Sequence, residues 1–397
     1  MAWSDPKTWT ADDLLTASDL NQYVSDNLSA LYALIQGGGR KNLLHNGAMQ
    51  IHQRGTSQAG ITSTTTATGT TSGNGYWTAD RWRTSPVNLG NWTQTVEDDA
   101  PTGSGFRKSL KMLLASGAES PNPAAGDYVL FNQYIEGQNL QSIKKGTADA
   151  QPLTLSFWVK SNKTGTYIVR FRDAANTRHV CASYTISASG TWEQKGITIP
   201  ADTTGAFAND NTVGLDVQWW LASGSTYTSG TLATAWASAT GADADVAVGQ
   251  TNLADTNSNY WQITGVQLEV GSANTGFEHK SYGTELAECQ RYYWQPTGIG
   301  PEESLGLGTY YSASDVYVRM YPPVTMRATP VLLGSTGADL FYTYVTGNVD
   351  YITRGAIDAY STNDVVGATF SGGSRSTGYT AILNATADGW LAFSADL

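Results

Sequence analysis

The sequence predicts a mainly β protein, with an N-terminal helix, a jelly-roll β-sandwich and a small C-terminal β domain. Two observations lead to this prediction. Short apolar runs alternate with period two, and clusters of Gly, Asn, Asp, Ser and Thr, the residues that turns require, separate them. Helical periodicity is convincing only within residues 1–40. Many short strands without intervening helices favour an antiparallel sandwich.

The composition narrows the function classes. The 397 residues include 23 Lys and Arg against 34 Asp and Glu, which gives a net charge of −11, and only 14% of all residues are charged. Nucleic-acid binding is not expected, because neutralising phosphates needs clustered Lys and Arg. No apolar run approaches the ~18 residues of a membrane span, and no secretory signal is visible. We expect a soluble protein that is made in a cytoplasm and does not insert into a membrane.

The two cysteines give no sign of a disulfide framework or a metal site. Cys181 and Cys289 are far apart in the sequence, and neither belongs to a CxxC pair. Without a metal-type spacing, buried free thiols are the expected state, and no cofactor is predicted.

The N-terminal helix carries an apolar stripe. Ser18 is a good N-cap and precedes Asp19 in the first turn. The stripe repeats at spacings of four and three residues, as in a heptad seam: Ala17, Asn21, Val24, Leu28, Leu31 and Ile35. Gly37, Gly38 and Gly39 then end the helix and form a hinge. The stripe either packs on its own domain or, as we favour, associates with other copies or docks on a partner.

The central region, residues 41–295, reads as the sandwich. Strands are expected at 128–135, 153–159, 167–171, 180–186, 192–199, 213–221 and 260–270, and residues 285–293 look helical. Within 153–159, Leu155, Phe157 and Val159 share one face, so they are core candidates. Within 213–221 the corresponding core row is Leu215, Val217, Trp219 and Leu221.

Residues 296–397 begin with a Gly/Pro break at 298–301 and continue with short aromatic strands. We expect strands at 317–321, 341–345 and 390–393, with Pro322, Pro323 and Pro330 between them. A C-terminal β domain of this region is the simplest interpretation.

The central region also resembles a domain found in bacteriophage tail-fibre and minor structural proteins. The resemblance begins with 42–50 (NLLHNGAMQ), Arg54-Gly55 and 77–82 (WTADRW). The later landmarks keep the same order: 133–137, 153–161, 165–167, 197–202, 214–219, 261–271, 277–278, 282–283 and 285–293. Residues 324–330 (VTMRATP) resemble distal fibre modules more weakly.

This resemblance implies a jelly-roll module similar to carbohydrate-binding modules, carried on a virion fibre. It supplies no ligand residues. The signature positions are interpreted as mainly architectural.

The sequence contains few indications of a catalytic site. His45, His52, His179 and His279 lie in no HExxH or nucleophile motif. The acid clusters at 97–99, 243–245 and 302–303 do not show the facing carboxylate pair that a glycoside hydrolase needs. Solvated turns explain them, although Asp243 and Asp245 have oxygen ligands of the kind that Ca²⁺ accepts.

Sugar binding has a better physical basis, because Tyr and Trp rings stack on sugar C–H groups and hydroxyl side chains match sugar hydroxyls. If Trp219 points inward, Trp220 points to the other face of the sheet. Tyr227 and Trp236 follow in the loop 222–250, so these three residues are the carbohydrate-site candidates. Packing against a neighbouring subunit is the alternative for the same cluster.

Three functions remain open. The first is a non-enzymatic virion fibre, homotrimeric, attached to other virion proteins through residues 1–40 and contacting host surface glycan. The second is a purely structural head decoration or tail connector without a ligand. The third is a polysaccharide depolymerase.

Overall fold

The structure is a computed structural model of the chain. It describes residue 14 and residues 16–25, 41–64, 75–119, 121–239, 243–296, 304–335, 340–345, 348–357, 361–386 and 390–397. Leu28, Leu31, Ile35 and the Gly37–Gly39 hinge lie outside these ranges, and the described chain tests neither the stripe beyond Val24 nor the hinge.

The N-terminal helix begins two residues earlier than predicted. α1 (Ala17–Asp19) continues into a π-helical turn, η1 (Leu20–Ser25). Its N-cap is Thr16 rather than Ser18, because Thr16 forms a capping box in which the Asp19 backbone N–H donates to Thr16 Oγ1 at 3.1 Å. Asn21 is exposed, and Val24 is 46% exposed, so the described part of the stripe is uncovered in a single chain.

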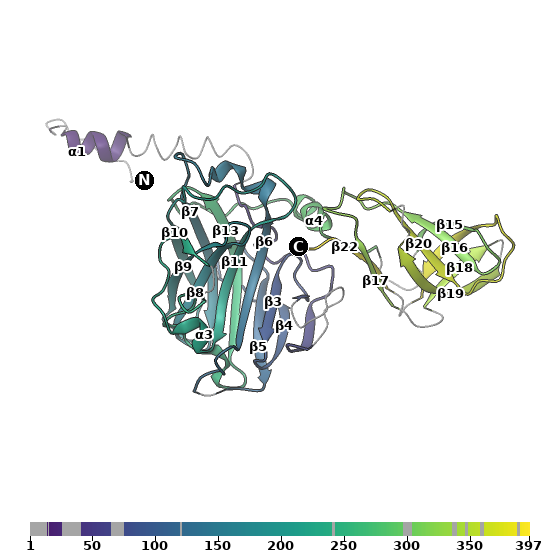
Figure 1. The fold of residues 1–397 in the computed structure, drawn as a ribbon, viewed down its shortest axis with the longest axis horizontal. Helices are drawn as coiled ribbons and strands as arrows, with labels where there is room; N and C mark the ends of the chain where they lie inside the picture. The colour runs from purple at the N-terminus through teal and green to yellow at the C-terminus, as the bar shows by residue number, and fades with distance from the viewer. Residues whose placement is uncertain are drawn as a thin grey trace.

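Two antiparallel sheets form the sandwich (Figure 1). The six-stranded sheet has the order β1-β4-β5-β13-β7-β10, and the seven-stranded sheet has the order β12-β9-β8-β11-β6-β3-β2. The strands of the first are β1 (Ser57–Ile61), β4 (Asn91–Glu97), β5 (Ser109–Ser116), β13 (Tyr260–Val270), β7 (Leu153–Ser161) and β10 (Glu193–Ile199). Those of the second are β12 (Ala237–Ser238), β9 (Arg178–Ile186), β8 (Gly165–Asp173), β11 (Val213–Ser223), β6 (Tyr128–Glu136), β3 (Arg83–Val87) and β2 (Gly75–Tyr76). The predicted fold class is confirmed, although β1 to β5 were not foreseen as strands.

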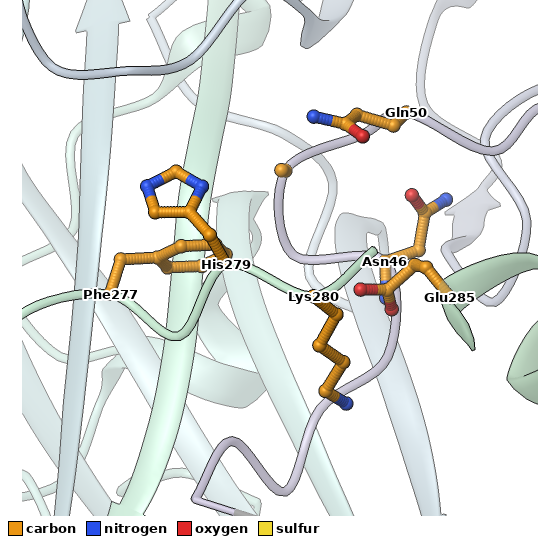
Figure 2. Close-up of a pocket in the computed structure, with 7 residues that line it drawn as sticks. Asn46, Gln50, Phe277, His279, Lys280 and Glu285 are labelled. Carbon is orange, nitrogen blue, oxygen red and sulfur yellow. The ribbon is translucent and has the colours of Figure 1, made fainter. Parts of the chain in front are cut away.

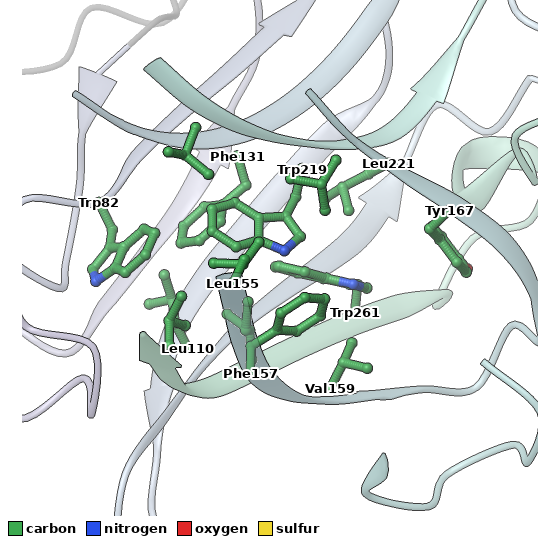
Figure 3. Close-up of a cluster of buried hydrophobic side chains, with 14 of the residues drawn as sticks. Trp82, Leu110, Phe131, Leu155, Phe157, Val159, Tyr167, Trp219, Leu221 and Trp261 are labelled. Carbon is green, nitrogen blue, oxygen red and sulfur yellow. The ribbon is translucent and has the colours of Figure 1, made fainter. Parts of the chain in front are cut away.

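The core lies between the two sheets and is aromatic (Figure 3). Both predicted core rows, that of β7 and that of β11, belong to it and are fully buried. Trp219 meets Phe157 edge-on at a ring-centroid distance of 5.8 Å, and Trp82 stacks on Phe131 at 5.0 Å. The period-two alternation therefore identified the inward face correctly.

Strand β13 changes phase at a glycine. Trp261 and Ile263 point into the core, and so do Val266 and Leu268, so the alternation slips by one residue between the two pairs. The pairing register with β7 shifts between Thr264 and Gln267, and Gly265 has a φ of +61°. Glycine suits such a bulge because it has no Cβ to oppose a positive φ.

Short helical segments complete the sandwich. α4 (Tyr282–Gln290) starts and ends three residues before the predicted helix, because Ser281 caps it by accepting the backbone N–H of Thr284. Three further short helical segments were not predicted: η2 (Gly137–Ile143), α3 (Ser225–Thr228) and η3 (Leu253–Asp255).

The C-terminal region contains a closed barrel in the order β15-β16-β20-β19-β18-β21. Its strands are β15 (Ser304–Tyr310), β16 (Asp315–Met320), β20 (Val366–Ser371), β19 (Asn348–Ile357), β18 (Phe341–Val345) and β21 (Thr380–Ala385). A three-stranded sheet of β14 (Tyr293–Trp294), β22 (Leu391–Ser394) and β17 (Val331–Gly334) lies between the barrel and the sandwich (Figure 1).

The last residues of the chain return to the sandwich. Arg54 pairs with both Asp80 and Asp396, and its guanidinium lies 3.5 Å from the centre of the Tyr293 ring. Arg327 donates its Nε proton to the carbonyl of Ala395 at 2.7 Å. The C-terminus thus ties the barrel to the sandwich through buried charges.

Candidate functional site

The predicted aromatic cluster forms on the outer face of the seven-stranded sheet. Trp220 points away from the core, as the alternation predicts, and its ring centroid lies 5.1 Å from that of Tyr227 and 5.3 Å from that of Tyr128. Trp220 belongs to a second apolar cluster formed by Leu130, Ile168, Cys181, Trp220, Val246 and Ala247.

This cluster does not form an exposed patch, which corrects the expectation from the sequence. Trp220 is only 2% exposed, because the covering loop, residues 224–239 and 243–250, packs over it through Tyr227, Leu232, Val246 and Ala247. Trp236 lies elsewhere: it packs against the main core, and its indole N–H donates to the carbonyl of Pro200 at 2.8 Å. A covered ring offers no stacking surface, so Trp220 supports a loop instead.

Two buried side chains of the sheet, Arg170 and His179, contact aspartates of that loop. Arg170 Nε donates to His179 Nδ1 at 3.0 Å, so the histidine proton sits on Nε2, which faces Asp245 Oδ2 at 3.3 Å. Burial lowers the pKa of His179, and the charge of Arg170 lowers it further, which keeps the ring neutral near pH 7. Arg170 NH2 also lies 3.7 Å from Asp243 Oδ1. We call Arg170, His179, Asp243 and Asp245 the loop clamp.

Beside the covered cluster, the outer face carries two transverse polar rows. Cross-strand pairing aligns Arg83, Asn132, Gln218 and Arg170 in the first row. It aligns Tyr134, Asp216, Arg172 and His179 in the second. We call these two rows the polar face.

Asp216 lies at the centre of the polar face and is 2% exposed. Asn132 Nδ2 donates to its Oδ1 at 2.7 Å, and Gln218 Nε2 donates to its Oδ2 at 2.6 Å. Burial raises the pKa of Asp216, although these two hydrogen bonds oppose the rise. The carboxylate is thereby held as a fixed acceptor beneath the surface.

Some polar atoms on the polar face and next to it lack partners within the described chain. Asn132 Oδ1, Ser85 Oγ and Asp245 Oδ1 are buried and have no hydrogen-bond partner within the described chain. A buried acceptor without a partner is costly, so each needs water or a ligand.

Three side chains form the accessible part of the polar face. Tyr134 and Arg83 are half-buried, and Arg83 NH1 donates to the Tyr134 hydroxyl at 2.8 Å, while Arg172 is exposed. A tyrosine ring with the guanidinium of Arg83 beside it, and with Arg172 beyond Asp216 in the same row, is chemistry suited to binding a polar saccharide. The alternation of polar residues in β8 and β11 is the sequence feature that indicates this face, whereas the aromatic residues predicted a site at Trp220, Tyr227 and Trp236.

The other predicted sites have structural explanations. Cys181 and Cys289 are buried and free, as expected, and burial raises the pKa of Cys181 to about 12. Within the described residues, no three His, Cys, Asp or Glu side chains gather in a way that could hold a metal ion. Among the described helices, none is long and apolar enough to cross a membrane.

A small pocket lies where the loop after residue 41 meets the start of α4 (Figure 2). Phe277 and His279 line one side, and Asn46 and Glu285 line the other. Glu285 accepts the backbone N–H of Asn46, so this carboxylate holds the loop against the helix. The pocket therefore has a structural explanation.

The barrel presents an exposed apolar row. Leu307, Ile382, Tyr344 and Val349 face one another across the adjacent strands β15, β21, β18 and β19. They are 65%, 38%, 46% and 46% exposed, respectively. We call these four residues the barrel row. Contiguous exposed apolar side chains of this kind mark contact surfaces.

Comparison with known proteins shows which solved structures are similar to this chain. No family model and no curated protein matches the chain. Among solved structures, the enzymatically active domain of tailspike protein 4 from bacteriophage CBA120 is similar at 12% identity and a TM-score of 0.30. That match covers 58% of this chain but only 21% of the tailspike chain.

Two similar structures are carbohydrate-binding modules. A CBM4 module is 8% identical with a TM-score of 0.27, and the match covers 57% of this chain and 97% of the module. The family 11 module from Clostridium thermocellum, solved with a β-1,3-1,4-mixed-linked tetrasaccharide, is 9% identical with a TM-score of 0.25. That match covers 50% of this chain and 91% of the module. Such low similarity identifies no family and assigns no site.

Proposed function

We propose that this chain is a non-enzymatic virion fibre protein that binds a host surface glycan on the polar face of its sandwich. The observation that carries the proposal is the polar face itself. There Tyr134 and Arg172 are accessible, and the amides of Asn132 and Gln218 hold the buried carboxylate of Asp216 in place. Saccharide sites combine ring faces with a few convergent polar groups in this way.

Binding is favoured over hydrolysis by the state of Asp216. Both of its oxygens accept hydrogen bonds from side-chain amides, so it is held as an acceptor beneath the surface. A glycosidase needs a second carboxylate across the scissile bond. Asp243 and Asp245 belong to the loop clamp, where they face Arg170 and His179.

The proposed homotrimer rests on two exposed apolar surfaces, the stripe around Val24 and the barrel row. A chain with a net charge of −11 repels its own copies, so association is least opposed where the surface is neutral and apolar. We propose attachment to other virion proteins through residues 1–40. A trimer would also convert weak glycan sites into strong binding through multivalency.

A glycan array with wild-type protein and Tyr134→Ala tests the site. The wild type should bind at least one surface polysaccharide, and Tyr134→Ala should lose that binding while its melting temperature stays close to the wild-type value. Tyr321→Ala is the matched control, because Tyr321 is 65% exposed and lies on the C-terminal region. Equal binding by Tyr134→Ala and wild type would show that the polar face is not the glycan site.

Enzyme action and assembly need separate measurements. Release of reducing ends from the bound polysaccharide would contradict the non-enzymatic proposal. Sedimentation of Ile382→Asp tests the barrel row, since a buried charge should shift a trimer toward smaller species. An unchanged sedimentation coefficient would show that the barrel row lies outside any subunit contact.

A further inference from the structure

Two arginine side chains of the polar face form no ion pair within the described chain, although both charges act on Asp216 and oppose the rise in its pKa. Arg172 is exposed, and its guanidinium makes no hydrogen bond to the described residues. Arg83 donates to the Tyr134 hydroxyl and lies 5.4 Å from the centre of that ring, but no carboxylate pairs with it there. Both therefore keep donors available to an external group.

This lack of partners contrasts with the other buried and half-buried cations of the sandwich. Arg178 pairs with Asp202, Arg291 pairs with Glu136, and Lys145 pairs with Asp173. The chain has 34 acids for 23 cations, so acids are not scarce. Arg83 is half-buried and has no such carboxylate partner among the described residues, which distinguishes it from these cations.

The one carboxylate between them does not use their donors. Asp216 pairs with Tyr134 on one side and Arg172 on the other in the strand register, yet its oxygens accept from Asn132 and Gln218. Amides thus hold the carboxylate in place. The Arg172 guanidinium remains at the surface with its planar fork unfilled, and Arg83 keeps the donors that do not serve the Tyr134 hydroxyl.

We infer that the polar face selects a saccharide with an anionic substituent, a carboxylate or a phosphate, held by Arg172 and Arg83. An arginine fork matches the two oxygens of such a group, and charge-assisted hydrogen bonds are stronger than neutral ones. Tyr134, which lies beside Arg83, supplies the ring against which the sugar packs. The inference rests on the proposed glycan function and defines the chemical class of its ligand.

The test measures binding of the full chain to alginate, polygalacturonate and poly(glycerol phosphate), with carboxyl-reduced alginate, carboxyl-reduced polygalacturonate and dextran as neutral counterparts. At least one acidic polymer should bind. The affinity for its neutral counterpart should be lower by a factor of about ten or more, as expected for the loss of a charge-assisted contact. The uronate and phosphate arms distinguish the two anionic groups. Added NaCl should weaken this binding, because exposed charges are screened.

Matched variants test whether Arg172 supplies the positive charge that binds the acidic polymer. Arg172→Gln should lose the preference for the acidic polymer, and Arg172→Lys should retain part of it, because the charge stays while the fork is lost. Arg107→Gln is the control, since Arg107 is an exposed arginine outside the polar face. All three should melt close to the wild type, because neither arginine is buried.

The outcomes separate the inference from the proposed function. Binding to a neutral polymer with equal or weaker binding to the acidic ones would overturn the inference and leave glycan binding intact. An acidic preference that survives in Arg172→Gln would also overturn it. Failure of the wild type to bind any polymer on this panel or on the glycan array would contradict both.

Discussion

Trp219 and Trp220 are neighbours in β11, point to opposite faces of the sheet and are both buried, at 0% and 2% exposure. Trp219 lies in the core between the two sheets, and Trp220 lies beneath the covering loop, residues 224–239 and 243–250. The same strand therefore holds the sandwich together on one face and supports a covering loop on the other.

Trp219→Ala should be strongly destabilising, because it leaves a large cavity among Phe157, Trp82 and Phe131. The free energy of unfolding should fall by about 3–5 kcal/mol, as it does for other large-to-small core substitutions. Trp219→Phe should cost much less, since it keeps a ring and removes an indole N–H that has no partner within the described chain. Denaturant unfolding measures both, and an unaltered midpoint for Trp219→Ala would contradict this packing.

Trp220→Ala should loosen the covering loop, residues 224–239 and 243–250, while the sandwich stays folded. Hydrogen exchange should rise at amides such as Ala247 N, which donates to the Tyr227 carbonyl at 2.8 Å. Trp219→Phe serves as the comparison, because it should leave exchange in this loop unchanged. Loss of glycan binding with unchanged exchange and melting temperature would show that Trp220 contacts ligand directly.

Acid should destabilise the protein in part through Glu136. Arg291 donates to Glu136 Oε1 from Nε and to Oε2 from NH2, each at 2.9 Å. Burial acts to raise the pKa of Glu136, but the hydrogen bonds from Arg291 and Tyr292 outweigh it and lower the pKa below its ordinary 4.5. The unfolded chain therefore takes up this proton at a higher pH than the folded chain does. The stabilisation is complete above a pH of about 4.5 and is lost as the pH falls through the folded pKa.

Glu136→Gln isolates this contribution. The variant should be less stable than the wild type at pH 7, and the difference should shrink as the pH falls from 6 to 3, because the variant has no proton to take up. Unfolding free energies over this range give the comparison. A difference that stays constant with pH would exclude titration of Glu136 as the cause.

Removal of residues 395–397 should uncouple the barrel from the sandwich. The deletion eliminates the Ala395 carbonyl that accepts from Arg327, the Asp396 carboxylate beside Arg54, and the Leu397 carbonyl that accepts from the Tyr76 hydroxyl at 3.2 Å. We expect a larger radius of gyration in solution scattering and faster proteolysis between β14 and β15. Scattering identical to the wild type would show that β14 and β22 suffice to hold the two parts together.

The sequence predicted the inward faces well and their surroundings less well. The bounds of β13 and β18 match the predicted 260–270 and 341–345, because period-two alternation and flanking turn residues are local signals. The closure of the barrel joins β15 to β21, some 75 positions apart, and no local pattern encodes that pairing. The burial of Trp220 likewise depends on a loop contact, so alternation gave its direction but not its exposure.

The polar face was not predicted from the sequence. The sequence predicted a carbohydrate site at Trp220, Tyr227 and Trp236, whereas Arg83, Tyr134 and Arg172 come from three other strands, and only the cross-strand register brings them together. The assembly role of the N-terminal stripe stays a prediction.

A crystal structure of the chain with the saccharide selected on the glycan array tests the central claim most directly. The sugar should lie over the polar face, with its ring against Tyr134 and a polar or anionic group within hydrogen-bond distance of Arg172. Electron density for the sugar elsewhere, for example along the barrel row beside Tyr344, with the polar face holding only water, would contradict the account.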